Sequence, residues 1–146
     1  MASFFDYDYN YKYNYYTEVL MKKVLIVDDE PVILTALSHL LSNKNTTIIT
    51  SSVMEEAEEA LKRYHFDLVI ADIRLSGVHG IEGLELLSYI KQLNPKTHVI
   101  IMTAYGSEEI KEDAYRRGAF YYFEKPIDIA HLISKVSEVG INMQDI

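Results

Sequence analysis

Residues 23–29 read Lys-Val-Leu-Ile-Val-Asp-Asp, so an apolar run of four residues leads directly into two acids. A short run rich in Val and Ile, without polar alternation, is typical of a strand that is buried on both faces of a parallel sheet. We therefore expect Asp28 and Asp29 to lie at the carboxyl end of a buried strand.

Three further apolar runs are each followed by a polar residue. They are Leu68–Ala71 before Asp72, Val99–Met102 before Thr103, and Phe120–Phe123 shortly before Lys125. The carboxyl ends of parallel strands open on one edge of the sheet, where ligands bind. The five polar side chains are therefore expected to converge on one site.

Helical segments separate these strands, and three of them carry a start signal: Pro31 at a first-turn position, the capping-box pattern Ser52–Glu55, and Asp128 as a cap. Further elements are expected as a strand at 46–50 and as helices at 84–93 and 107–117. Five alternating strand–helix units predict an α/β fold, doubly wound as a flavodoxin-like three-layer sandwich with the parallel strand order 2-1-3-4-5.

The composition limits the function classes. The chain has 146 residues, 49% of them hydrophobic and 25% charged, with a net charge of -8, which suits one globular domain without direct nucleic-acid contact. It has no cysteines, which excludes disulfides and thiolate metal sites. No apolar stretch approaches the roughly 18 residues that span a bilayer, and no signal peptide is recognisable. We therefore expect no membrane contact and a cytoplasmic location.

Residues 1–20 differ from the rest of the chain. The tract 2–16 alternates Tyr with Asn and Asp and holds half of the 12 tyrosines, and a natural start follows at Met21. We interpret 1–20 as a low-complexity tail and 21–146 as the domain. The tail is an artefact of upstream initiation, a sticky aromatic segment for a partner, or a segment without a role, and these alternatives stay open.

Three carboxylates in one site repel one another, since two unit charges about 4 Å apart cost roughly 4 kcal/mol at an effective dielectric constant near 20. Bound protons or a bound cation must therefore stabilise Asp28, Asp29 and Asp72. Carboxylate oxygens without His or Cys favour Mg²⁺. Together with the Lys125 ammonium and the Thr103 hydroxyl, such a site suits a phosphoryl group. An aspartate can accept that group as a nucleophile.

Residues 21–140 resemble a receiver domain of a two-component response regulator, of the CheY-like superfamily. The resemblance rests on Asp28-Asp29, Asp72, Thr103-Ala104, Tyr122 and Lys125-Pro126, which stand in order at compatible spacing. The stretches 102–106 and 123–126 are most similar to receivers that precede σ54-type transcription activators. The chain is thus interpreted as a single-domain response regulator or as the receiver part of a longer transcriptional regulator.

The resemblance implies a role for each site residue. Asp72 would accept a phosphoryl group from a phosphohistidine of a sensor histidine kinase. Asp28 and Asp29 would bind Mg²⁺ together with Asp72 and the backbone carbonyl of Arg74. Lys125 would contact the phosphoryl group, and its bond to the following proline is expected to be cis.

The resemblance also implies a switch. Thr103 would swing in to hydrogen-bond a phosphoryl oxygen, and Tyr122 would move inward into the space that Thr103 vacates. The surface formed by the helix at 107–117, the strand at 120–123 and the helix at 128–139 would then change and regulate an unknown downstream protein. A phosphorylation-driven homodimer through this surface is an expectation from the family alone.

The loop after Asp72 departs from the family pattern. Ser76 stands where a Pro is common, and the stretch 77–83 is about three residues longer than usual. Arg74 and Tyr105 occupy positions that tune phosphoryl hydrolysis in this family. We expect them to shield the site and to lengthen the phosphoryl lifetime.

Other interpretations compete with this one. An aspartate-nucleophile phosphatase would need a second acid two residues after Asp72, where this chain has Arg74. A flavin-binding module would need a Gly-rich phosphate loop after the first strand, where the acids 28–30 would repel phosphate. Asp28-Asp29 could simply cap a helix, and Tyr122 could simply pack on the last helix. We expect a phosphoacceptor rather than a turnover enzyme.

Overall fold

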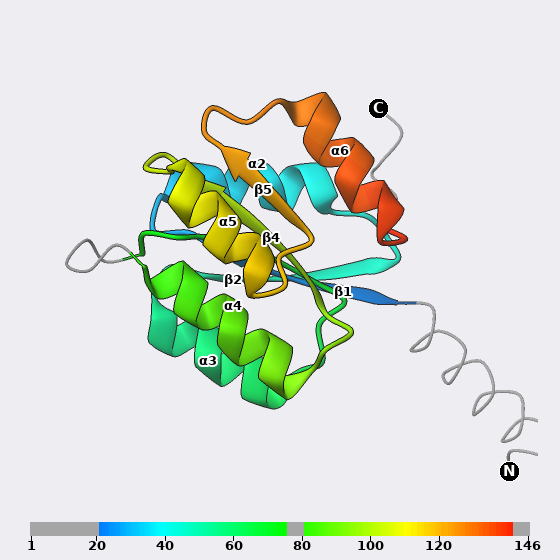
Figure 1. Cartoon of the computed structure of the whole chain (residues 1–146). Coiled ribbons are helices and arrows are strands. Elements are labelled where there is room, and N and C mark those ends of the chain that lie inside the picture. The colour runs from blue at the N-terminus through cyan, green and yellow to red at the C-terminus, as the bar shows by residue number, and fades with distance from the viewer. Residues whose placement is uncertain (1–20, 76–80, 142–146) are drawn as a thin grey trace, which may run out of the picture.

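Five strands form one parallel sheet in the order β2-β1-β3-β4-β5 (Figure 1). They are β1 (Lys22–Val27), β2 (Thr46–Ser51), β3 (Leu68–Asp72), β4 (His98–Thr103) and β5 (Tyr121–Glu124). The structure is a computed structural model that describes residues 21–75 and 81–141. The predicted fold class and strand order are confirmed.

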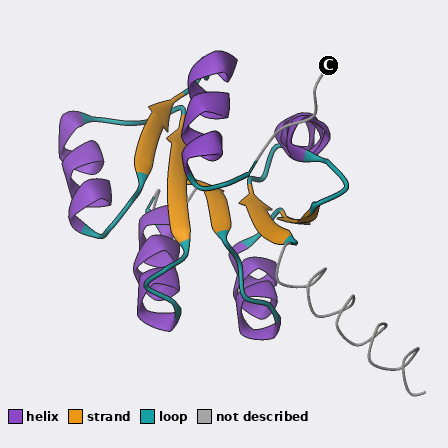
Figure 2. Cartoon of the chain, turned by 90° about the vertical axis from the view of Figure 1, so that its right-hand side faces the viewer, coloured by secondary structure: helices purple, strands orange, loops and turns teal. Residues whose placement is uncertain are grey.

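Helices cover both faces of the sheet. In the described residues they are α2 (Pro31–Leu41), α3 (Met54–Arg63), α4 (Glu82–Leu93), α5 (Glu108–Arg116) and α6 (Ile129–Glu138). Buried side chains of α2 and α6 pack on one face of the sheet, and those of α3, α4 and α5 pack on the other. Figure 1 shows α2 and α6 above the sheet with α3 and α4 below it, and Figure 2 shows helices on both sides of the strands.

The central strands are apolar along their whole length because both of their faces are covered. Residues 24–27 of β1 and 68–71 of β3 are completely buried. Successive side chains alternate between the two cores: Val24 and Ile26 join the core beneath α2 and α6, and Leu25 joins the opposite core. Continuous apolar runs, rather than alternating ones, are what such a sheet requires.

The strand register brings polar residues to one edge. Val27 of β1 pairs with Ala71 of β3, so Asp28 and Asp72 follow at the same level. Thr103 is the last residue of the neighbouring strand β4. The parallel topology therefore delivers these three side chains to the carboxyl edge of the sheet.

The predicted start of α3 was wrong. This helix begins at Met54, and its N-cap is the extended residue Val53, without a side-chain capping hydrogen bond. Ser52 therefore lies one residue too early to form the predicted capping box. The other two start signals hold: Pro31 is the first residue of α2, and the Asp128 side chain accepts a backbone N–H in the first turn of α6.

The predictions for the tail 1–20 and for loop residues 76–80 concern parts of the chain outside the described residues. Within residues 21–75 and 81–141, no helix is long and apolar enough to cross a membrane. The Lys125–Pro126 peptide bond is cis, as expected.

Candidate functional site

Asp28 and Asp72 are both buried at the carboxyl edge of the sheet, with exposed fractions of 0% and 5%. In each case a backbone N–H of the loop that follows the strand donates a hydrogen bond to one oxygen of the carboxylate. Asp28 Oδ1 accepts the Glu30 N–H at 2.9 Å, and Asp72 Oδ1 accepts the Arg74 N–H at 3.2 Å. Because the backbone fixes Oδ1 in both residues, Oδ2 is the oxygen that meets the other site residues.

Lys125 supplies the positive charge between these acids. Its backbone N–H donates to the Thr103 carbonyl at 2.8 Å, which ties it to the end of β4. Its Nζ lies 2.9 Å from Asp28 Oδ2, 3.2 Å from Asp72 Oδ2 and 3.2 Å from Glu30 Oε1. Charge-assisted hydrogen bonds of this kind are stronger than neutral ones. One ammonium group therefore bridges three carboxylates.

Burial raises the pKa of Asp72 above its ordinary value of 3.8, and the charge of Asp28 adds to the rise. The Arg74 N–H and the Lys125 ammonium oppose the rise without cancelling it. For Lys125, burial alone acts to lower the pKa, but the hydrogen bonds and charges of Asp28 and Asp72 outweigh it and leave the pKa raised. Lys125 is thus charged at neutral pH, whereas the fold disfavours the ionised form of Asp72.

Four acids are close enough to hold one cation. Carboxylate oxygens of Asp28, Asp29, Glu30 and Asp72 all lie within 4.8 Å of one another, and Asp29 and Glu30 are exposed. An all-oxygen, carboxylate donor set fits a hard cation such as Mg²⁺. The residues present therefore fit the metal that the sequence predicts, while the role of the Arg74 carbonyl as a ligand stays a prediction.

Thr103 is buried at the end of β4, with 1% of its surface exposed. Its Oγ1 accepts the Tyr105 N–H at 3.0 Å, so the loop after β4 engages the hydroxyl in this structure. The guanidinium carbon of Arg74 lies 4.2 Å from the centre of the Tyr105 ring, and both side chains are exposed. This contact links the loops after β3 and β4, while their role as a shield over the site stays a prediction.

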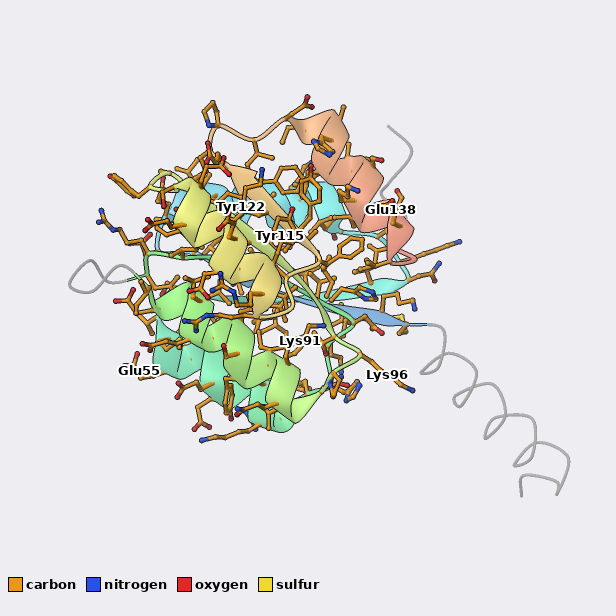
Figure 3. All side chains as sticks on the ribbon, in the orientation of Figure 1. Glu55, Lys91, Lys96, Tyr115, Tyr122 and Glu138 are labelled. Carbon is orange, nitrogen blue, oxygen red and sulfur yellow. The ribbon has the colours of Figure 1, made fainter. Side chains whose placement is uncertain are left out.

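Tyr122 in β5 is buried and joins the core beneath α5. Tyr121 and Phe123 face the other way, and their rings contact His131 of α6. The alternative interpretation, that Tyr122 packs on the last helix, is therefore wrong: alternate residues of a strand point to opposite faces, and Tyr122 points away from α6. The backbone N–H of Tyr122 donates to the Tyr115 hydroxyl at 3.2 Å, and Figure 3 shows both tyrosines at α5 and β5.

The site residues described above all fall inside one family match. The family model described as the response regulator receiver domain matches residues 24–137. The chain belongs to the response regulator receiver domain family.

Curated relatives of this receiver domain include longer regulators. The response regulator protein PilR of Pseudomonas aeruginosa is 40% identical over 111 residues, which cover 76% of this chain and 24% of PilR. The DNA-binding transcriptional regulator NtrC of Escherichia coli is 36% identical over 122 residues, which cover 84% of this chain and 25% of NtrC. The chain thus spans about a quarter of the length of these curated relatives.

Two solved structures that are similar to this chain are also receiver domains. A response regulator receiver domain protein (CheY-like) from Methanospirillum hungatei is similar with a TM-score of 0.74 and 30% identity, covering 81% of this chain and 92% of that one. The beryllofluoride-activated NtrC4 receiver domain dimer is similar with a TM-score of 0.72 and 28% identity, covering 82% and 96%.

Glu30 is the site residue of this receiver domain to which the sequence assigned no role. Its carboxylate contacts Lys125 Nζ at 3.2 Å and lies within the acidic cluster. The sequence feature that could have indicated this role is the position of Glu30 directly after Asp28-Asp29, in the turn that leads away from β1. The acidic run 28–30 by itself predicts only repulsion of a phosphate.

Proposed function

We propose that this chain is a phosphorylation-dependent signalling switch and that Asp72 is its phosphoacceptor. The observation that carries the proposal is the buried Asp72 carboxylate, held by a backbone N–H on one oxygen and by Lys125 on the other. A carboxylate so fixed next to a lysine and a cluster of further acids is suited to receive a phosphoryl group rather than to serve the fold.

In the proposed step a carboxylate oxygen of Asp72 attacks phosphorus and forms an acyl phosphate P–O bond. The P–N bond of a kinase phosphohistidine breaks at the same centre, and the imidazole leaves with the electron pair. Lys125 lies where its ammonium stabilises the negative charge of the transferred group. Thr103 adds a hydroxyl donor, because an oxygen that accepts the Tyr105 N–H still has its own O–H to donate.

Asp28, Asp29 and Asp72 are proposed to hold Mg²⁺ with the backbone carbonyl of Arg74. Glu30 joins them as an additional acid at the rim of the site. The cation would balance the charge of the acids and of the phosphoryl oxygens, which is the usual contribution of Mg²⁺ in phosphoryl transfer.

The proposed output surface consists of α5, β5 and α6. Helix α5 suits this role because Ala114 is its one buried residue, so little apolar packing opposes a shift. A sensor histidine kinase would donate the phosphoryl group, and a downstream protein or attached domain would respond. The DNA-binding transcriptional regulator NtrC supports a transcriptional output, and the NtrC4 receiver dimer supports homodimerisation on activation. Family membership also supports a cytoplasmic location.

A turnover phosphatase is less well supported. Such an enzyme needs an acid two residues after its nucleophile, and the side chain found there is the Arg74 guanidinium stacked on Tyr105. Slow hydrolysis of the chain's own acyl phosphate is compatible with the proposal, but repeated turnover of an external phosphate ester is not.

The test uses acetyl phosphate as a donor in the presence of Mg²⁺, followed by intact mass spectrometry. Wild type should gain one phosphoryl adduct, and Asp72→Asn should gain none. Asp113→Asn, which changes an acid on α5 that pairs with Arg116 and Arg117, is the matched control and should behave as wild type. An equal adduct on Asp72→Asn, or no adduct on wild type, would overturn the proposal.

A further inference from the structure

Gly106, in the loop between β4 and α5, lies against the end of the Tyr122 side chain. A Cβ placed on Gly106 would overlap the Tyr122 hydroxyl oxygen. The same Cβ would come within 3.1 Å of Glu124 Oε1 and 3.1 Å of Thr103 Cγ2. The Tyr122 hydroxyl therefore occupies the space that a side chain at position 106 would fill.

The backbone gives no other reason for a glycine at this position. Within the described residues, the glycines with positive φ are Gly118 and Gly140, so Gly106 has a conformation that other residues adopt. The backbone conformation at position 106 is therefore compatible with alanine, and only steric contact with neighbouring atoms disfavours it. Of these neighbours, the tyrosine hydroxyl is the one that cannot stay where it is.

The buried position of Tyr122 is held by packing rather than by its hydroxyl. The hydroxyl oxygen is buried and has no partner of good hydrogen-bond geometry in the described part of the chain; the Ser107 backbone forms only a weak hydrogen bond to it, which acts to lower the pKa of the phenol. Burial raises the pKa of this phenol, and the charges of Glu124 and Glu108 raise it further. A buried hydroxyl without a well-formed hydrogen bond contributes little to holding its side chain in place. Packing in the core beneath α5, rather than a strong hydrogen bond of the hydroxyl, therefore holds the ring in its buried place.

We propose that Gly106 is a positioning residue for the switch aromatic: its lack of a side chain admits the Tyr122 ring to the buried place beside Thr103. A side chain at position 106 overlaps the Tyr122 hydroxyl and thereby displaces the tyrosine ring toward solvent. That the ring's position matters for signalling rests on the proposed function, but the steric coupling between positions 106 and 122 does not.

The first readout is the solvent exposure of the Tyr122 ring at neutral pH. Its NMR signals are assigned by comparison with Tyr122→Phe, and a soluble gadolinium chelate broadens the signals of exposed rings. In wild type the Tyr122 signals should be protected, whereas those of Tyr105, which is 63% exposed, should broaden. In Gly106→Ala the Tyr122 signals should broaden as those of Tyr105 do. A ring that stays protected in Gly106→Ala would overturn the proposal.

The second readout is a double-mutant cycle in urea. Gly106→Ala should lower the unfolding midpoint of wild type, and the same change made in Tyr122→Phe should lower it by less than half as much. The rescue is expected because phenylalanine lacks the oxygen that the new Cβ meets. Tyr121→Phe, on the opposite face of β5, is the matched control and should give no rescue.

Each outcome of the cycle decides the matter. If Gly106→Ala does not fold, then restored folding in the double variant with Tyr122→Phe supports the coupling, and continued failure overturns it. An equal midpoint loss in both backgrounds also overturns it. Neither readout uses a phosphoryl donor, so a failure here is distinct from a failure of Asp72 to accept phosphate.

Discussion

Replacement of Lys125 by methionine removes the ammonium that contacts the carboxylates of Asp28, Glu30 and Asp72. Methionine keeps most of the length and the apolar stem of lysine, so the change isolates the charge. The Lys125 side chain is 12% exposed, and two of its three partners, Asp28 and Asp72, are buried as well. Solvent therefore screens these contacts only weakly.

The magnitude follows from the distances. At an effective dielectric constant near 20, a contact of 2.9 Å between unit charges is worth about 6 kcal/mol, and one of 3.2 Å about 5 kcal/mol. Desolvation of the ammonium offsets a large part of this attraction. Loss of one partner from a buried ion pair typically costs about 3–5 kcal/mol. We expect the free energy of unfolding of Lys125→Met to fall by about this amount at pH 7 without divalent cations.

The loss should depend on pH in a defined direction. Burial raises the pKa of folded Asp72, and Lys125 opposes this rise, so the variant raises the pKa further above the ordinary 3.8. A folded state that holds its proton more tightly than the unfolded state loses stability as the pH rises through the interval between the two pKa values. The difference from wild type should therefore shrink as the pH is lowered from 7 into this interval.

The assay is urea denaturation followed by circular dichroism at several pH values. Lys62→Met is the matched control: Lys62 faces Glu59 at 4.0 Å on an exposed surface, so its loss should be below about 1 kcal/mol at every pH. A Lys125→Met variant as stable as the control at pH 7 would refute the electrostatic reasoning. A loss that grows on acidification would refute the assignment of the effect to Asp72.

Three further predictions concern the same site. Asp72→Asn should raise the free energy of unfolding at pH 7 without divalent cations, because burial disfavours the carboxylate; a lower value in urea denaturation would contradict this. Mg²⁺ should raise the melting temperature of wild type, with a stabilisation of about 2.7 kcal/mol at 100 times Kd; an equal rise in Asp28→Asn would remove Asp28 from the metal site. Gly83→Ala should lower the free energy of unfolding by about 1–3 kcal/mol, because its Cβ would overlap the Asp72 backbone carbonyl oxygen beneath α4; an unchanged urea midpoint would show that α4 does not press on β3.

The sequence predicted the three central strands β1, β3 and β4 well because burial on both faces leaves a continuous apolar run. The ends were less certain: Asp72 and Thr103 belong to their strands because each still pairs with a neighbour, Met102 and Glu124 respectively. A run of apolar residues does not contain that information. The start of α3 was missed for a related reason, since the extended conformation of Val53 sets it rather than the nearest serine.

The candidate site was predictable as far as it depends on topology. The convergence of Asp28, Asp72 and Lys125 follows from parallel strands alone. The inclusion of Glu30 depends on the turn after β1, and the contact between Gly106 and Tyr122 depends on how a loop meets a side chain 16 residues later in the chain. Contacts of this kind belong to tertiary packing, which no local pattern encodes.

The most direct measurement locates the phosphoryl group. The chain is treated with acetyl phosphate and Mg²⁺, an acyl phosphate is reduced with borohydride, which converts a phosphorylated aspartate to homoserine, and the peptides are sequenced by mass spectrometry. Homoserine at position 72 in the peptide 64–74 is the expected result, with Asp67 in the same peptide left unchanged as an internal control. Homoserine at position 28 or 29 instead, or aspartate retained at position 72, would contradict the role of Asp72 as the phosphoacceptor.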